Sequence, residues 1–166
     1  MKYIYPVTAL LLCLFSSCGK SNDAPELIKR LPVDRVFKTV ILPVKLSETT
    51  GLDAYKEKVY IVNSVDEFPD NEIIPCDDLE AVDVDFTRQS MIISYQLQLG
   101  KIVSAEYKWL YNDWDDHYTL DTTFKKIKDS EYENGAVENL SYIRSALLVT
   151  RIPSDSRISW SYQVKE

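Results

Sequence analysis

Glycine is scarce in this chain, and its few copies stand far apart. The 166 residues hold four glycines, at Gly19, Gly51, Gly100 and Gly135. A phosphate-cradling loop, or the fingerprint of a dinucleotide-binding fold, needs two or three glycines within a few residues. The spacing therefore disfavours nucleotide-dependent enzymes of both kinds.

Histidine is scarcer still, with His117 as the single copy. A zinc site would need carboxylates or Cys76 to complete it, and no HExxH or CxxC spacing is present. A hydrolase would need Asp115 or Asp116 to orient His117 and a serine to attack, yet no nucleophile-elbow motif supplies one. We expect a surface histidine, a protein that is not an enzyme, and no metal or cofactor.

Positive charge is in the minority. Lysine and arginine number 19 against 26 acidic residues, which gives a net charge of −7. The only basic cluster is FKKIK at 124–128. Binding to nucleic acid depends on neutralising phosphates with basic side chains. We therefore expect no nucleic-acid partner.

Long apolar runs are also few, and the main one lies at the N-terminus. After Lys2, the stretch Val7 to Phe15 is apolar except for Thr8. This is the length of a signal-peptide core and is shorter than the roughly 20 residues that span a bilayer. Residues 1–17 are therefore predicted to be a signal peptide, whether of a plain secretory or of a lipoprotein kind.

The residues that follow decide between these two kinds. Phe15-Ser16-Ser17-Cys18 resembles the lipobox of bacterial lipoproteins, in the looser form found in Bacteroidetes. The resemblance implies cleavage before Cys18 and fatty-acyl groups on that residue. Two or three acyl chains anchor a protein stably, at about 0.8 kcal/mol per buried CH₂. We expect a lipid-anchored protein of the cell envelope, in the outer membrane on its periplasmic or surface face.

Three cysteines then leave one thiol in the mature chain. Cys13 departs with the signal peptide and Cys18 is acylated, so only Cys76 remains and no internal disulfide is available. Asp77 and Asp78 follow Cys76 directly, and their charges raise a thiol pKa. We expect a buried or tolerated thiol, and stability that comes from a packed core.

The rest of the chain divides into a tether and one domain. Residues 18–34 are predicted to be a tether with a helical turn in ELIKRL, because Ser, Asn, Asp and two prolines bury little apolar surface. From residue 35 to 166, apolar residues recur with a period of two, which is typical of strands. We expect an antiparallel β-sandwich or open barrel with one or two short helices. The strands are predicted at 35–46 (an edge strand, because of Pro43), 58–62, 91–97 (central), 101–111, 117–124, 145–152 (alternatively a helix end) and 157–164.

Residues 59–164 resemble a recurring bacterial pattern, carried by YIVNSVDEF, VDVDFTRQSMIISYQLQLGKI and SALLVTRIPSDSRISW. The C-terminal domain of the lipoproteins that stabilise a protease complex has this order of elements. The resemblance implies a small β-domain that acts by binding a protein. It also implies scaffold roles for Asp85, Phe86 and Gly100, and no catalytic residue.

The stretch YKWLYNDWDDHY, at 107–118, is the strongest candidate for a binding site. Trp114 lies at a loop tip among polar neighbours, where a tryptophan is hard to bury and often anchors a partner. Tyr107, Trp109 and Tyr111 share one strand face, so they either line the core or extend the binding surface. The acidic residues of the loop also raise the alternative of calcium binding through Asp113, Asp115 and Asp116.

One possible modification site lies beyond this loop. Asp121-Thr122-Thr123 resembles the O-glycosylation acceptor of exported Bacteroidetes proteins, which implies a glycan on Thr122.

Three functions follow in order of support. The first is a non-catalytic envelope lipoprotein that binds a protein. The second is a glycan-binding accessory lipoprotein that uses an aromatic patch around Trp114. The third is a small hydrolase that uses His117.

Overall fold

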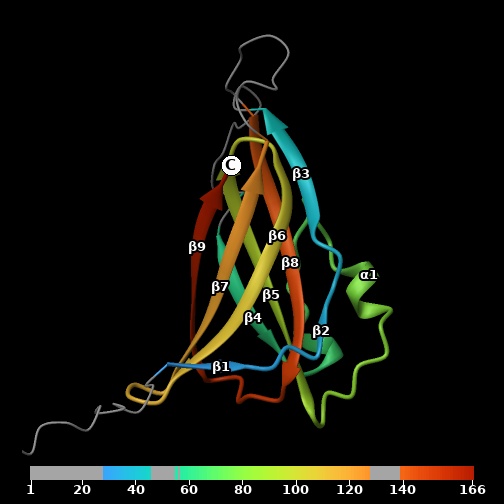
Figure 1. Cartoon of the computed structure of the whole chain (residues 1–166). Helices are drawn as coiled ribbons and strands as arrows, with labels where there is room; N and C mark the ends of the chain where they lie inside the picture. The colour runs from blue at the N-terminus through green and yellow to red at the C-terminus, as the bar shows by residue number, and fades with distance from the viewer. Residues whose placement is uncertain (1–27, 46–54, 56, 128–138) are drawn as a thin grey trace, which may run out of the picture.

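The computed structural model describes residues 28–45, 55, 57–127 and 139–166. These residues form two β-sheets packed face to face, with two short helical turns (Figure 1). The predicted mainly β class is therefore confirmed. Within the described ranges, no helix is long and apolar enough to cross a membrane.

The first sheet has four strands. In spatial order they are β1 (Ile28–Leu31), β6 (Ile102–Asn112), β7 (His117–Lys126) and β9 (Arg157–Lys165). β6 pairs antiparallel with β1 and β7, whereas β7 and β9 run parallel. Alternation along each strand predicts one buried face but not this neighbour order, so the parallel pair was not foreseen.

The second sheet has five strands. In order they are β2 (Arg35–Val36), β8 (Asn139–Thr150), β5 (Gln89–Leu99) and β4 (Lys58–Val62), with β3 (Val40–Lys45) also paired to β8. β5 is central, as the sequence predicts, and β8 is a strand rather than a helix end. Pro43 lies on β3 opposite Ser141, and no described strand pairs with the other side of β3. An edge position suits Pro43, because proline has no N–H to donate to a ladder.

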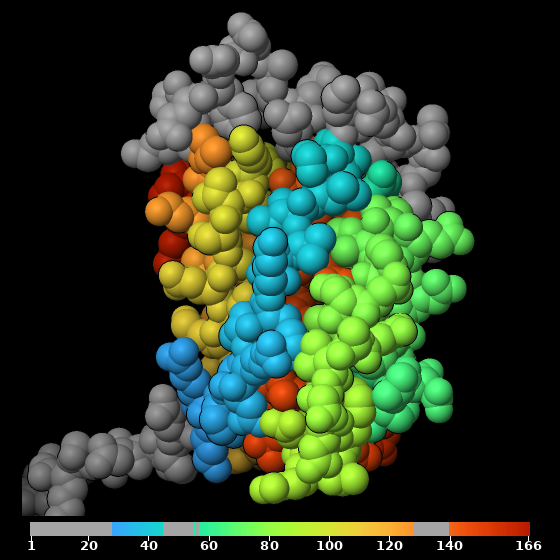
Figure 2. Space-filling view, turned by 90° about the vertical axis from the view of Figure 1, so that its right-hand side faces the viewer, coloured from blue at the N-terminus to red at the C-terminus, as the bar shows by residue number. Residues whose placement is uncertain are grey.

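The segment between β4 and β5 covers the outer face of the second sheet. It contains the 3-10 turn η4 (Val65–Glu67) and the helix α1 (Asp77–Glu80), and it lies beside the β2–β3 segment on the face shown in Figure 2. Its apolar residues pack on outward-facing residues of β5, such as Met91 and Ile93. Both faces of β5 are therefore buried over most of its length, its polar residues included.

A second core lies between the two sheets. Ile92 of β5, Leu147 of β8, and Trp109 and Leu120 of the first sheet meet there. The Tyr107 hydroxyl also crosses the gap, 2.7 Å from the Ser145 hydroxyl oxygen. The sheets are thus held by apolar packing and by at least one polar bridge.

The predicted tether is too long at its C-terminal end. Residues Ile28–Leu31 form β1, which pairs with β6 from Ile28 opposite Asn112 to Leu31 opposite Trp109. A helical turn was expected here, and the edge of β6 overrides that local preference by offering a partner for the backbone. The domain therefore begins no later than residue 28.

Candidate functional site

The β6–β7 hairpin ends in a tight turn at Asp113–Asp116, at the lower end of the molecule in Figure 1. The Asn112 side-chain oxygen accepts a hydrogen bond from the Trp114 backbone N–H at 3.0 Å. Asp116 has φ 52°, in the left-handed region that Asp tolerates better than most residues. Asn and Asp at these positions thus explain why the chain turns here.

Side chains from three strands hold this turn. Lys29 of β1 forms an ion pair with Asp113, and Arg157 of β9 donates to the Asp115 carbonyl. The Tyr111 hydroxyl donates to the Asp116 carboxylate at 2.8 Å, and this bond raises the pKa of Tyr111 to about 12. The turn is therefore braced on both sides.

Trp114 is the residue of the turn whose side chain is left in solvent. Its exposed fraction is 82%, the highest among the exposed large hydrophobic residues of the described ranges. A large apolar side chain on a braced turn loses little conformational freedom when a partner covers it. The arrangement therefore presents an indole ready for contact.

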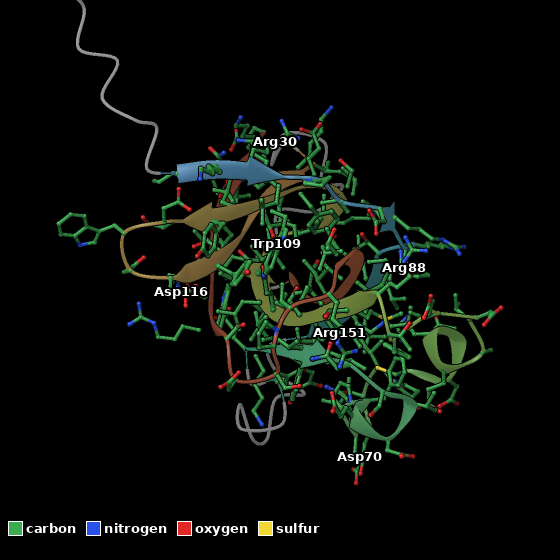
Figure 3. The ribbon with its side chains drawn as sticks, turned by 90° about the horizontal axis from the view of Figure 1, so that it is seen from below. Arg30, Asp70, Arg88, Trp109, Asp116 and Arg151 are labelled. Atoms are coloured by element: carbon green, nitrogen blue, oxygen red, sulfur yellow. The ribbon has the colours of Figure 1, made fainter. Side chains whose placement is uncertain are left out.

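Behind the turn, three aromatic rings run into the core. Tyr111 and Tyr118 have ring centroids 4.8 Å apart, and Tyr118 stacks on Trp109 at 5.3 Å. Figure 3 views this end and shows Trp109 between the two sheets and Asp116 at the hairpin. The hairpin tip is thus coupled by packing to the sandwich interior.

An apolar cavity opens beside these rings. Its volume is about 220 Å³, and Leu31, Pro32, Trp109, Tyr118 and Ile152 supply its apolar lining. The small volume and apolar walls suit a single apolar side chain better than a large ligand, since ligand pockets usually measure about 300–1,000 Å³.

The structure divides the four aromatic candidates. Trp114 is exposed and Tyr111 is partly exposed, but Trp109 is 1% exposed and packs in the core. The Tyr107 hydroxyl bonds inward to Ser145 and Thr39. Of the two alternatives for Trp109 and Tyr107, the structure agrees with the core and not with a binding surface, so their predicted binding role is corrected: the pleat of β6 turns both toward the second sheet.

Thr122 is also corrected as a glycosylation site. Its side chain is wholly buried between the sheets, because it alternates with the outward-facing Asp121 and Thr123. A glycosyltransferase has no access to this hydroxyl in the folded domain.

His117 lies on the outer face of the first sheet. Its Nε2 is 2.7 Å from the Ser159 hydroxyl oxygen. Two similar pairs follow along β7 and β9, Asp121 with Ser161 at 2.8 Å and Thr123 with Gln163 at 2.9 Å. No carboxylate of the described residues bonds to His117, so the orienting acid of a Ser-His hydrolase is missing here. The pair fits a row of cross-strand surface contacts.

The acidic residues of the turn do not converge on a common point. Asp113 pairs with Lys29, Asp115 with Arg157, and Asp116 with Tyr111. In the part of the chain that the structure describes, no three His, Cys, Asp or Glu side chains are placed to hold a metal ion. The geometry therefore does not support the calcium alternative at this loop.

Cys76 is a buried thiol, as expected. Its Sγ lies 3.1 Å from the Tyr95 hydroxyl, and burial raises the pKa of the thiol, with a smaller contribution from Asp78. The sequence predicted the direction of this shift but assigned it to the neighbouring acids alone.

Two features of the structure were not predicted from the sequence, one in the interior and one on the outer face of the first sheet. Gln96 and Gln98 are buried on the inner face of β5, although the alternation Ile92, Ser94, Gln96, Gln98 was a readable signal of a polar inner face. Ser159 was not singled out as the partner of His117, because pairing between β7 and β9 cannot be read from one sequence.

Comparisons with known proteins add no relative. No protein-family model, no curated protein and no solved structure matches the chain. Asp85, Phe86 and Gly100 nevertheless have structural roles here. Asp85 accepts the Thr87 N–H at 3.1 Å, Phe86 packs on the outer core, and Gly100 takes φ 92° between β5 and β6.

Proposed function

We propose that this protein is a non-catalytic, lipid-anchored β-sandwich of the cell envelope that binds a protein partner through the Trp114 turn. The observation that carries the proposal is the 82% exposure of Trp114 on a turn held by Lys29, Arg157 and Tyr111. Tryptophan and tyrosine are enriched among the residues that contribute most to protein–protein binding.

The cavity beside Trp109 and Tyr118, behind the turn, supports the same role. A partner that covers Trp114 is well placed to insert one apolar side chain between Leu31, Tyr118 and Ile152. The glycan-binding alternative at Trp114 has less support, because it needs several aromatic rings in one exposed patch about the width of a sugar ring, and only Trp114 and Tyr111 of the four candidates remain exposed to some degree.

Replacing Trp114 is expected to abolish capture of the partner. The lipidated protein is cross-linked mildly in its own envelope, purified, and its bound proteins and glycans are quantified by mass spectrometry. Loss of a central interface tryptophan weakens binding by roughly tenfold or more. We therefore expect Trp114→Ala to lose a protein that the parent recovers in stoichiometric amounts.

Val65→Ala is the matched control for this experiment. Val65 is a similarly exposed apolar residue, but it lies on η4 in the outer layer. It should leave capture unchanged. Equal capture by the parent and Trp114→Ala, or recovery of glycan without protein, would contradict the proposed protein-binding role.

The anchor has a test of its own. Cys18→Ser removes the sulfur that the lipobox resemblance assigns to acylation, so the chain is expected to leave the membrane pellet for the soluble fraction. Mass spectrometry of the parent should show acyl groups at the N-terminal cysteine. Unchanged sedimentation of Cys18→Ser, or an unmodified Cys18 in the parent, would rule out the lipid anchor.

A further inference from the structure

Five buried polar atoms gather in one part of the sandwich interior without a hydrogen-bond partner among the described residues. They are Ser94 Oγ, both amide atoms of Gln96, Gln98 Nε2 and Thr122 Oγ1. Gln96 is 1% exposed and Gln98 is 4% exposed. A buried amide or hydroxyl without a partner is costly, so native structures rarely keep several together unless water or a ligand completes them.

The strand registers place these atoms near one another. Ser94, Gln96 and Gln98 follow one another along the inner face of β5. Ser94 pairs with Ser145, whose hydroxyl meets that of Tyr107 across the gap, and Thr122 pairs with Tyr107 in the opposite sheet. Ser94 and Thr122 are thus direct neighbours of the two residues that bridge the sheets.

Other polar groups of the same interior are fully paired. Ser90, on the same face of β5, donates to Asn63 at 2.5 Å and accepts the Ile152 N–H at 2.9 Å. Asn63 also donates to the Ile152 carbonyl and to Ser154. Among the described residues, the unpaired atoms therefore lie only in the part of the interior beyond Ser90, toward the upper end of the molecule in Figure 1.

A cavity at the upper end reaches this group at Gln98, the one residue of the group that lines it. It measures about 630 Å³, and its lining includes Gln98, Leu99, Tyr162 and Val164. β4 pairs with β5 only as far as Tyr95, and no described strand covers the rest of that edge. β9 continues past this point, so its inner face and the end of β5 enclose a groove between the sheets.

The chemistry of this groove is that of a site for a neutral, hydroxylated compound. Carboxamides and hydroxyls both donate and accept hydrogen bonds, as sugar hydroxyls do. The lining also holds Lys126 and Glu166, which form an ion pair at 3.1 Å and so balance each other's charge, and the unpaired atoms include no ionised group. This combination does not favour a ligand with a net charge. The Tyr162 ring and the side chains of Leu99 and Val164 are partly exposed there and offer an apolar surface to the C–H face of a sugar.

We infer that this cavity binds a neutral saccharide unit, with the Gln98 amide as its first polar contact and Gln96 behind it. The site lies at the opposite end of the sandwich from Trp114 and goes beyond the proposed function. Because the cavity volume falls in the usual range for small ligands, one or two sugar rings fit its scale.

The test is a titration followed by nuclear magnetic resonance. Glucose, galactose and N-acetylglucosamine are each added to the full protein, and the side-chain amide signals of its glutamines are recorded. We expect saturable shifts of the Gln96 and Gln98 signals with at least one sugar. Gln98→Met should weaken that binding by at least tenfold, because it removes the amide while keeping the length of the side chain.

Gln163→Met is the matched control. Gln163 is an exposed glutamine on the outer face of β9, where its amide bonds to Thr123, and its replacement should leave sugar binding unchanged. Tyr162→Ala should weaken binding without disturbing the core, which guards against a Gln98 variant that fails to fold. Trp114→Ala should bind sugar normally even though it loses the protein partner.

Three results would overturn the inference. The first is no saturable shift with any of the three sugars, which would mean that water alone completes these amides. The second is equal binding by the parent, Gln98→Met and Tyr162→Ala. The third is loss of sugar binding in Trp114→Ala, which would place the sugar at the other end.

Discussion

Trp109→Ala is expected to lower the free energy of unfolding by about 3–5 kcal/mol, the usual cost of removing a buried Trp or Phe side chain. Trp109 is packed between the sheets and stacks on Tyr118 at 5.3 Å. It also forms part of the 220 Å³ cavity wall, so its loss would enlarge an existing space instead of allowing collapse. Urea denaturation followed by circular dichroism measures the change.

Trp114→Ala is the internal control, because it makes the same chemical change five residues away in the same hairpin. An exposed residue without packing partners is expected to change stability by no more than about 0.5 kcal/mol. Similar losses in both variants would contradict the opposite placements of the two indoles. A loss below about 1 kcal/mol in Trp109→Ala would contradict the packed core.

Asp78→Asn is expected to cost about 2 kcal/mol at pH 7. Arg144 is 2% exposed, and its guanidinium donates to the Asp78 carboxylate at 2.6 Å and to the Pro75 carbonyl. Removing the carboxylate strands a buried positive charge, which costs about 3–5 kcal/mol in a fully buried pair. The Asp78 side chain is 60% exposed, so solvent screening reduces the loss.

The pH dependence of this contact has a defined sign. The hydrogen bond from Arg144 holds the pKa of Asp78 below its ordinary value of 3.8. The contribution to stability is therefore complete above about pH 3.8 and is lost as the pH falls through the pKa of the folded state. The difference in unfolding free energy between the parent and Asp78→Asn should shrink over that interval.

Two further variants isolate the contact. Asp77→Asn changes the preceding residue of α1, which forms no ion pair with the described residues, and should cost no more than about 0.5 kcal/mol. Adding Arg144→Met to Asp78→Asn should recover stability, because it removes the stranded charge while keeping the apolar stem. A double variant less stable than Asp78→Asn would show that the Pro75 contact dominates.

Much of the architecture follows from alternation. Every predicted strand from β3 to β9 has its counterpart in the structure, because a half-buried strand must alternate apolar and polar residues. The neighbour order does not follow, since the parallel pairing of β7 with β9 depends on how the chain crosses between sheets. β1 escaped prediction because four residues, Ile28–Leu31, are too few to show a period.

The candidate site was predicted in part. The polar neighbours of Trp114 indicated an exposed loop tip, because such a loop cannot bury an indole. The sequence did not determine whether the side chains of Tyr107 and Trp109 point into the core or into solvent. Alternation shows that two residues share a face of a strand, but not which face meets the second sheet. The buried glutamines of β5 were overlooked because glutamine is usually exposed.

The pairing of Ile28 with Asn112 also bears on how the domain stands above a bilayer. With an anchor at Cys18, 28 − 18 = 10 residues of chain precede β1, a reach of at most about 35 Å. The Trp114 turn lies beside Ile28, where the chain from the anchor enters the domain. With that anchor, this end of the sandwich would face the membrane surface. The groove beside Gln98 lies at the far end of strands of 11 residues, about 35 Å away. A protein partner would therefore sit in or on the same membrane, while a solute would arrive from the open compartment.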